Sequence, residues 1–329
     1  MSTTTKQRVL LLGATGETGR SILQGLLEDS ASFEVEALVR PSSTAKPGVK
    51  ALAERGVNIR VADISGPIED LAKALSGIDV LISAIDAGSQ LAQIQLATAA
   101  KEAGVKRFVP CGFITVAPPG GVMALRDSKE LVYQHIRKLF LPHTIIDIGY
   151  WYQISFPTVP SGRADYTAII KPNSAIHGDG ETPTILIDHA DIGRFVARII
   201  KDERTLNKSV IAYGDVLSEN AVFETMERLS GEKIERQYIS TDEIVSARAE
   251  ASAAAKADPT NPFAGMMASL QDYNYSKYVR GDNTLAYAAY LGYLDARELY
   301  PDFQPKGFEQ FVRDVLNGKG EKRQAMSLP

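Results

Sequence analysis

Three glycines recur at a three-residue spacing near the N-terminus, in the run Gly13-Ala14-Thr15-Gly16-Glu17-Thr18-Gly19. The apolar segment 8–12 precedes the run, and a segment with helical apolar spacing, 21–28, follows it. Between a strand and a helix, such glycines allow a tight turn, close approach of the backbone to a pyrophosphate, and close helix packing. The N–H groups that begin the helix favour an anion. The run therefore predicts a phosphate-binding turn, in which Thr15, Glu17 and Thr18 contact the bound group together with Gly13, Gly16 and Gly19.

A basic residue, Arg40, ends the second predicted strand, 33–39. Sites for NAD usually carry Asp or Glu there, which accepts a hydrogen bond from the ribose 2′-hydroxyl. Arginine instead binds a 2′-phosphate through two parallel charged hydrogen bonds, so Arg40 predicts NADP(H). The alternative is that Glu36, inside the strand, holds the ribose. Further donors to the phosphate are expected among Ser42, Ser43, Lys46 and Lys50, of which we assign Ser42 and Lys50.

Short apolar runs alternate with helical patterns through the first half of the chain. The runs predict strands at 8–12, 33–39, 57–62, 80–83, 107–110 and 143–148. Helices are expected at 21–28, 49–55, 68–75, 91–103 and 128–139. This alternation is typical of an α/β fold, a doubly wound parallel Rossmann sheet with helices on both faces. The pattern changes after about residue 150, where 152–175 is rich in Pro, Gly and Ser.

The change in pattern predicts two domains. We expect an NADP-binding Rossmann domain at 1–150 and a smaller α/β substrate-binding domain at 151–329, with the chain partly returning to the Rossmann sheet around 183–215. Within the second part, a strand is expected at 183–187 and helices at 191–201, 218–229 and 241–256. Ser218 is a candidate N-cap.

The bulk composition excludes several classes of protein. The chain has 329 residues, 23% charged residues and a net charge of −4, so it has no basic field for nucleic acid. Its single cysteine excludes a disulfide framework. No apolar run approaches the length of a membrane span, and no apolar leader precedes the first strand. We therefore expect a cytoplasmic protein with no nucleic-acid or membrane partner.

Several segments resemble one known family. Arg107-Phe108-Val109-Pro110, after the segment 101–106, looks like the fifth strand of the isoflavone reductase-like group of NmrA-like, atypical short-chain dehydrogenases/reductases. The G-x-x-G-x-x-G spacing of the first turn also resembles the short-chain superfamily. Later segments that agree are 175–180, 187–193, 205–209, 218–220 and 298–302. The resemblance covers about residues 7–315.

The resemblance implies NADPH-dependent reduction of a phenolic or conjugated small molecule. Ordinary short-chain enzymes use Tyr-x-x-x-Lys on the helix after the fifth strand, but here Tyr133 is followed four residues later by Arg137. The isoflavone reductase-like group instead has a lysine at the start of this helix, and Lys129 occupies that position. Its implied roles are to hold the nicotinamide ribose and to act as general acid or base, aided by a pKa that desolvation lowers. A second match, Tyr273-x-x-x-Lys277, falls in an apparent tyrosine-rich loop and is interpreted as a coincidence.

One turn departs from the family pattern. The family commonly reads Pro-Ser-Glu-Phe-Gly after the fifth strand, whereas this chain reads Pro110-Cys111-Gly112-Phe113-Ile114. The departure puts the substrates of the plant enzymes in doubt for this chain. Phe113 is retained and is expected beside both the nicotinamide and the substrate, and Cys111 is interpreted as a small buried residue near the cofactor. The expected cofactor-binding set also includes Ser83, Ala84 and Gln93.

A group of aromatic residues follows the sixth predicted strand. Aromatic side chains suit a flat conjugated ligand, so we expect Tyr150, Trp151, Tyr152 and Phe156 to form the far wall of the substrate site. The alternative is that they form a core between the two domains. Met266, on a predicted C-terminal helix, is expected to close the site. The four histidines lack metal-ligand spacing, and no metal is expected.

Two other functions stay open on the sequence alone. Regulatory NmrA-like members bind a dinucleotide without turning it over, so a non-catalytic sensor is one alternative. A cofactor-using isomerase or cyclase is the other, because its fold would look the same. The expected partner is a small aromatic or conjugated molecule, and a homodimer is an open alternative to a monomer.

Overall fold

A computed structural model of the chain describes residues 6–323. Its N-terminal part contains five parallel strands in the order β3-β2-β1-β4-β5. The bounds are β1 (Gln7–Leu12), β2 (Phe33–Val39), β3 (Asn58–Val61), β4 (Val80–Ser83) and β5 (Arg107–Val109). A parallel bridge between Phe108 and His143 leads to β6 (Thr144–Ile148), which pairs with β10 (Lys208–Ala212). The later chain thus returns beside β6, and β13 (Leu294–Asp295) lies next to β10.

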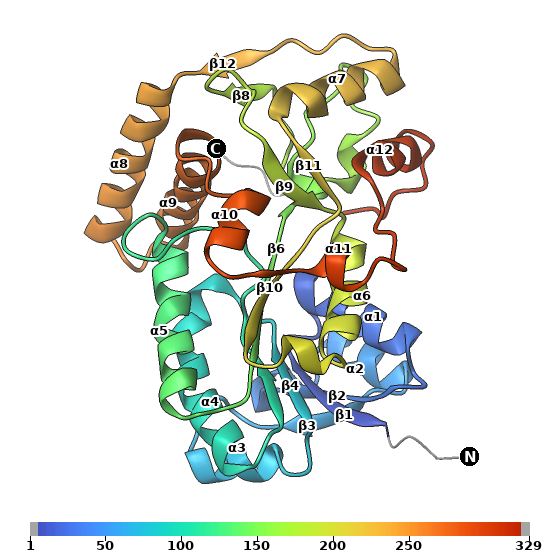
Figure 1. Cartoon of the computed structure of the whole chain (residues 1–329), viewed down its shortest axis with the longest axis vertical. Coiled ribbons are helices and arrows are strands. Elements are labelled where there is room, and N and C mark those ends of the chain that lie inside the picture. The colour runs from blue at the N-terminus through green and yellow to red at the C-terminus, as the bar shows by residue number, and fades with distance from the viewer. Residues whose placement is uncertain (1–5, 324–329) are drawn as a thin grey trace.

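Alternate residues of β1 face two separate cores. Val9 and Leu11 pack in the core that contains α1 (Glu17–Glu28) and α6 (His189–Ile199). Leu10 and Leu12 face the opposite core, which is covered by α3 (Ile68–Ala74), α4 (Gln93–Glu102) and α5 (Ala124–Lys138). Since a strand turns successive side chains to opposite faces, helices must cover both faces of this sheet. The predicted doubly wound Rossmann fold is confirmed (Figure 1).

The start of α5 differs from the prediction. The helix begins at Ala124 rather than near residue 128, so Lys129 lies in its second turn. Its N-cap residue, Met123, makes no side-chain cap bond, and the sequence therefore carries no start signal there. Ser128, which looked like a helix start, instead donates its hydroxyl to the carbonyl oxygen of Ala124 at 3.1 Å.

The later elements form a second part, in the upper half of Figure 1. A small sheet has the order β11-β9-β7, with β7 (Tyr150–Trp151), β9 (Thr184–Ile187) and β11 (Asp215–Leu217). Beside it, β8 (Ala175–His177) pairs with β12 (Gln237–Ile239). The helices are α7 (Glu219–Ser230), α8 (Thr241–Ala257), α9 (Pro262–Asn274), α10 (Leu285–Tyr290), α11 (Ala296–Leu299) and α12 (Phe308–Leu316). Within residues 6–323, no helix is both long and apolar enough to cross a membrane.

The segment around Tyr273 and Lys277 is not a loop, and that prediction was wrong. Tyr273 lies in α9, which continues directly into a π-helical turn, Tyr275–Val279. Ser276 and Lys277 are both buried in this turn. Tyrosines are poor helix formers, and packing rather than propensity decides the structure here.

Helices α1 and α6 approach closely at two glycines. A Cβ added to Gly193 would lie 1.8 Å from the carbonyl oxygen of Ser21, and one added to Gly25 would lie 2.2 Å from the carbonyl carbon of Gly193. The Ser21 hydroxyl donates to the carbonyl oxygen of His189 at 2.6 Å and accepts from the N–H of Gly193 at 3.1 Å. This contact ties the phosphate-binding helix to the later half of the chain.

Replacing Gly193 by alanine should destabilise the protein by at least about 2 kcal/mol, because the backbone of α1 must move to admit the methyl group. Gly265→Ala in α9 is the matched control, since nothing lies within 4 Å of its added Cβ. That variant should be unchanged or up to about 1 kcal/mol more stable. Urea unfolding measures both, and equal stabilities would contradict the close-packing argument.

Candidate functional site

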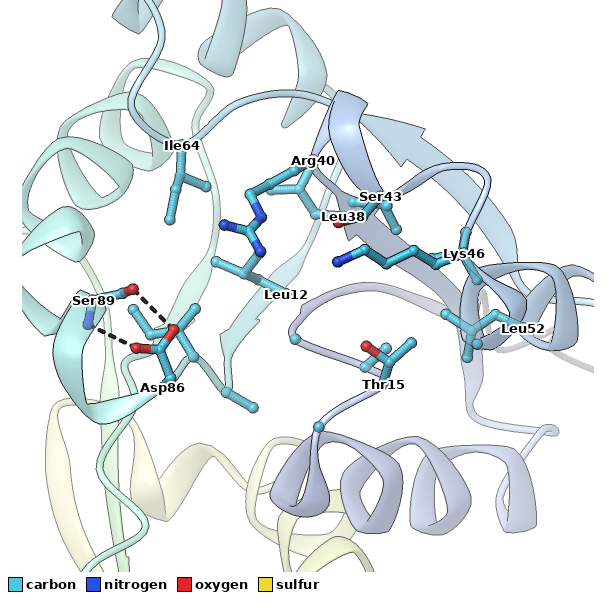
Figure 2. Close-up of a pocket in the computed structure, with 18 residues that line it drawn as sticks. Leu12, Thr15, Leu38, Arg40, Ser43, Lys46, Leu52, Ile64, Asp86 and Ser89 are labelled. Carbon is cyan, nitrogen blue, oxygen red and sulfur yellow. Dashed lines mark hydrogen bonds between the residues drawn. The ribbon is translucent and has the colours of Figure 1, made fainter. Parts of the chain in front are cut away.

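A cavity of about 460 Å³ opens at the carboxyl ends of β1, β2 and β4 (Figure 2). This edge is where doubly wound sheets bind ligands. Residues from the glycine turn, the end of β2 and the segment after β4 converge on it. The lining residues are Leu12, Gly13, Ala14, Thr15, Gly16, Leu38, Val39, Arg40, Ser43, Lys46, Gly48, Val49, Leu52, Ile64, Ala84, Ile85, Asp86 and Ser89.

The backbone at two of the three predicted glycines leaves no room for a side chain. Gly13 has a φ of +85°, and a Cβ there would lie 2.3 Å from the carbonyl oxygen of Ala84. A Cβ at Gly19 would lie 1.9 Å from the carbonyl oxygen of Gly13. At Gly16, by contrast, an added Cβ meets only ordinary contacts, and Gly16 lines the cavity. The turn therefore presents bare backbone to the cavity at the start of α1, as a pyrophosphate requires.

Arg40 and Glu36 have different surroundings. Figure 2 shows the guanidinium group of Arg40 extending into the cavity. Glu36 does not line it and instead accepts hydrogen bonds from Arg60 at 2.7 Å and Arg8 at 3.0 Å. Burial alone would raise the pKa of Glu36, but these two arginines outweigh burial and hold the pKa below its ordinary value. Glu36 is therefore engaged between strands, which argues against it as a ribose partner.

The donors beside Arg40 are not the two that we assigned. Ser43 and Lys46 line the cavity, whereas Ser42 and Lys50 do not. The chain after β2 forms a single 3-10 turn, Pro41–Ser43, before α2 (Pro47–Glu54), and this turn directs Ser42 outward. The sequence contained all four candidates but no signal to choose among them. Asp86 and Ser89, which also line the cavity and hydrogen-bond to each other, were missed.

Five other predicted cofactor residues lie behind or beside this cavity. Glu17 forms ion pairs with Arg20 and Arg323. Gln93 accepts a hydrogen bond from the N–H of Cys111 at 2.7 Å, so it supports the turn after β5. These five are Glu17, Thr18, Gly19, Ser83 and Gln93; Cys111, Phe113 and Lys129, also predicted to bind the cofactor, do not line the cavity either.

Lys129 lies beside the turn that follows β5. Its Nζ donates to the carbonyl oxygen of Cys111 at 2.6 Å and to Oε1 of Gln90 at 3.1 Å. The side chain is buried and has no ion-pair partner among residues 6–323. Burial lowers the pKa of Lys129. The Cys111 Sγ also contacts the carbonyl oxygen of Ile85, which lines the larger cavity, so Cys111 connects the Lys129 amine to the wall of that cavity, which Lys129 itself does not line.

A second cavity has a volume of about 210 Å³, and the first residue along the chain that lines it is Phe113, two residues after Cys111. Its wall is mostly apolar and combines the 113–115 segment, β7 and α9. The lining residues are Phe113, Ile114, Thr115, Gly149, Tyr150, Trp151, Ile154, Ile170, Met266, Ser269, Leu270 and Tyr273. The structure thus brings together Phe113, Tyr150, Trp151 and Met266 as predicted, and it adds Tyr273, whose ring centroid lies 5.6 Å from that of Tyr150.

Tyr152 and Phe156 do not reach this cavity, and their assignment to the substrate site was wrong. A 3-10 turn, Tyr152–Ile154, directs both into the core of the second part, against Phe311. The Tyr152 hydroxyl donates to Asp215 at 3.1 Å. Side chains alternate between the two faces of a sheet only within a strand. Because β7 ends at Trp151 and a 3-10 turn follows, Tyr150 and Trp151 line the cavity, whereas Tyr152 and Phe156 pack in the core.

A buried ion pair joins α5 to β6. Arg126 donates to Oδ2 of Asp147 at 2.6 Å and to the carbonyl oxygen of Thr115 at 2.9 Å. The Tyr293 hydroxyl donates to the same carboxylate oxygen at 2.5 Å. Burial opposes the charge on Arg126, but Asp147 outweighs burial and raises the arginine pKa. Arg126 therefore fixes α5 one turn before Lys129.

Asp147→Asn should destabilise the protein by about 3–5 kcal/mol, because it removes the buried counterion of Arg126 and leaves only Glu130, at 3.9 Å, as a weaker partner. Tyr293→Phe is the milder comparison, with an expected loss of about 1 kcal/mol for one hydrogen bond. Urea unfolding at pH 7 measures both variants. Similar small losses would show that the ion pair does not hold this region together.

Comparison with known proteins identifies the family. The NmrA-like family model matches residues 5–312, nearly the whole chain. The chain belongs to the NmrA-like family. This NmrA-like protein is 43% identical to asnovolin J 5′,6′-dehydrogenase of Aspergillus novofumigatus (strain IBT 16806), over 97% of this chain and 98% of that protein. It is 27% identical to a phenylcoumaran benzylic ether reductase of Ginkgo biloba, over 94% of this chain and 99% of that protein.

Solved structures agree with this assignment. A crystal structure of isoflavone reductase is similar to this NmrA-like chain with a TM-score of 0.76 and 25% identity, and the match covers 94% of this chain and 99% of that one. A leucoanthocyanidin reductase–NADPH complex from Vitis vinifera has a TM-score of 0.79 and 24% identity, with the same coverage. The predicted family and fold are confirmed.

Proposed function

We propose that this chain is an NADP(H)-dependent oxidoreductase that acts on a small aromatic or conjugated metabolite. The observation that carries the proposal is the place of Lys129. It is a buried amine, with no ion-pair partner among residues 6–323, that donates to the carbonyl oxygen of Cys111. Cys111 contacts Ile85 of the dinucleotide cavity and lies two residues before Phe113 of the aromatic cavity. Burying a charge in this way is costly, and such groups cluster at functional sites.

The dinucleotide cavity fits NADP(H). The bare backbone at Gly13 and Gly16 receives the pyrophosphate, and Arg40 with Ser43 and Lys46 surrounds the place of the 2′-phosphate. When bound, the nicotinamide supplies or removes a hydride. The two relatives with printed activities, a dehydrogenase and a reductase, support hydride chemistry in either direction.

The protein groups have separate tasks in this proposal. Lys129 gives a proton to the substrate during reduction and takes one back in the reverse direction, since burial lowers its pKa and makes its ammonium group a readier proton donor. Phe113 lines the substrate cavity two residues after Cys111, the hydrogen-bond partner of Lys129, and Tyr150, Trp151 and Met266 hold the apolar body of the substrate. Residues 1–150 thus bind the cofactor, and residues 151–329 supply most of the substrate wall.

The expected partner is a small molecule, and the oligomeric state stays a prediction. Cys111, the single cysteine, is buried and unpaired, which fits the expected reducing, cytoplasmic setting. The chain offers a buried lysine and an apolar cavity lined by aromatic rings that a non-catalytic sensor does not need, so catalysis is favoured over sensing.

Arg40→Ala should weaken NADPH binding at least tenfold, which is about 1.4 kcal/mol, and leave NADH binding unchanged. The reason is that only NADPH carries the 2′-phosphate. Isothermal titration with both nucleotides measures this, with the exposed Arg55→Ala as control. Equal loss for NADH and NADPH would mean that Arg40 does not recognise the phosphate.

Lys129→Met should lower kcat/KM for reduction by about 10²–10⁴-fold while NADPH still binds. In the wild type, the rate of reduction should fall as pH rises through the lowered pKa of Lys129, because the proton donor is lost, and this fall should be absent in the variant. Lys138→Met, at the exposed end of the same helix, is the control. Stopped-flow NADPH oxidation, with aryl enones as trial substrates, measures the profile. An active Lys129→Met variant with the wild-type pH profile would contradict the assignment.

A further inference from the structure

A second buried lysine lies on the far side of the substrate cavity wall. Lys277 is 1% exposed and has no ion-pair partner among the described residues. Its Nζ lies 3.4 Å from the centroid of the Tyr150 ring and donates to the Tyr278 hydroxyl at 3.1 Å. The wall residue Tyr150 therefore has substrate space on one side and an ammonium group over its ring.

The local backbone is unusual at the same place. Lys277 is in the middle of the π-helical turn Tyr275–Val279, which follows α9 without a break. Such turns are rare and often occur at functional sites. A methionine or leucine would fill this position without burying a charge, so packing alone does not explain a lysine here.

Two polar groups of the wall lack protein partners. The Thr115 hydroxyl is buried in the cavity wall and makes no hydrogen bond in the part of the chain that the structure describes. No hydrogen bond from the Tyr150 hydroxyl to residues 6–323 occurs either, and burial raises its pKa, so it stays a donor. The unmatched hydroxyl of Thr115 is fully buried, which is costly and points to a ligand that satisfies it, whereas Tyr150 is half-buried and its hydroxyl is free to donate to the same ligand.

We propose that Tyr150 and Thr115 form a subsite for an electron-rich oxygen of the substrate, and that Lys277 is the positioning residue that acts on this subsite through Tyr150. The ammonium group held over the ring draws electron density from the phenol, which makes its hydroxyl a stronger donor. The ligand class is a conjugated molecule with a carbonyl, enolate or phenolate oxygen. The inference rests on the proposed function, because it names the chemistry of the same substrate cavity.

The charge of Lys277 is sensitive to pH. Burial lowers the pKa of Lys277 to about 7, and Glu219 partly opposes this shift. The groups facing it are Tyr150 of β7, Tyr278 of its own turn, and Glu219 of α7, which pairs with His177 of β8. A negative oxygen at the subsite favours the charged amine, so binding of such a ligand should weaken as pH rises through about 7.

The test uses 2,4-dinitrophenolate as the probe and 2,4-dinitrotoluene as its uncharged counterpart, both titrated against the full chain. Lys277→Met should weaken binding of the phenolate at least tenfold and remove its pH dependence, while the toluene affinity stays unchanged. Tyr150→Phe should weaken phenolate binding as well, and the double variant should lose little more than either single one. The exposed Lys256→Met in α8 is the control.

Three outcomes would overturn the inference. The first is a wild type that binds the phenolate no better than the toluene. The second is a Lys277→Met variant that keeps the phenolate affinity, and the third is an equal loss of both ligands, which would mean a merely structural lysine. NADPH titration in the same preparations separates this result from the proposed function. If NADPH does not bind, the proposed function fails, but the phenolate pattern still decides the role of Lys277.

Thermal unfolding provides a readout that does not depend on any ligand. The pKa of Lys277 is lower in the folded chain than in the unfolded chain. Burial of the charged amine therefore lowers the free energy of unfolding, and this loss has its full size below pH 7. The loss shrinks as pH rises and disappears above the ordinary lysine pKa of about 10.4. Lys277→Met should therefore have a higher Tm than the wild type at pH 6.5, and the difference should shrink by pH 10. A variant with a lower Tm at pH 6.5 would indicate a structural role instead.

Discussion

The buried ion pair between Arg126 and Asp147 fixes α5 against the sheet and against the wall of the aromatic cavity at Thr115. Asp147 belongs to the central strand β6, and Arg126 belongs to α5, so the pair determines where this helix lies on the sheet. The same arginine holds the carbonyl oxygen of Thr115, in the segment that leads from one cavity to the other, and Tyr293 adds a bond from the later half. In a low-dielectric interior, such a network permits only the arrangement that satisfies every member. Lys129, three residues after Arg126, is held in place as a result.

The chain buries charged side chains in two ways. Arg126 has a counterion and stabilises the fold, whereas Lys129 and Lys277 have none among the described residues and belong to the proposed functional site. Arg126 is buried with a counterion, whereas Lys129 and Lys277 are buried with hydrogen-bond acceptors and aromatic rings only. Both amines have lowered pKa values because burial disfavours their charge. Lys129 contacts Cys111, two residues before Phe113 of the aromatic cavity, and Lys277 lies over the ring of Tyr150 in the cavity wall. A conjugated molecule in that cavity would thus have a proton donor at one end and a polarised hydroxyl at the other.

The sequence predicted the Rossmann half well, because strict alternation between buried strands and amphipathic helices leaves one topology. The strands at 33–39 and 80–83 match the structure residue for residue. Local sequence patterns failed to predict which side chains face a cavity, because tertiary packing determines this. No pattern distinguishes Ser43 from Ser42 within a single 3-10 turn, and a turn after Trp151 moves Tyr152 from the cavity to the core. Lys277 was dismissed because a π-helical turn has no sequence signature. Its position in the site follows from contacts with Tyr150, more than a hundred residues away in the chain.

The departure of the 110–114 turn from the family pattern has a steric cause. A Cβ added to Gly112 would lie 2.5 Å from the carbonyl oxygen of Ile146 and 3.2 Å from Oδ1 of Asp147, so no side chain fits. The turn is pressed against β6, where Phe113 adopts a φ of +51° and donates its N–H to the same Ile146 oxygen at 2.7 Å. That bond offsets part of the cost of the left-handed conformation. Glycine at this position therefore permits the tight turn, and the carbonyl oxygen of the preceding residue, Cys111, accepts the hydrogen bond from the Lys129 amine at 2.6 Å.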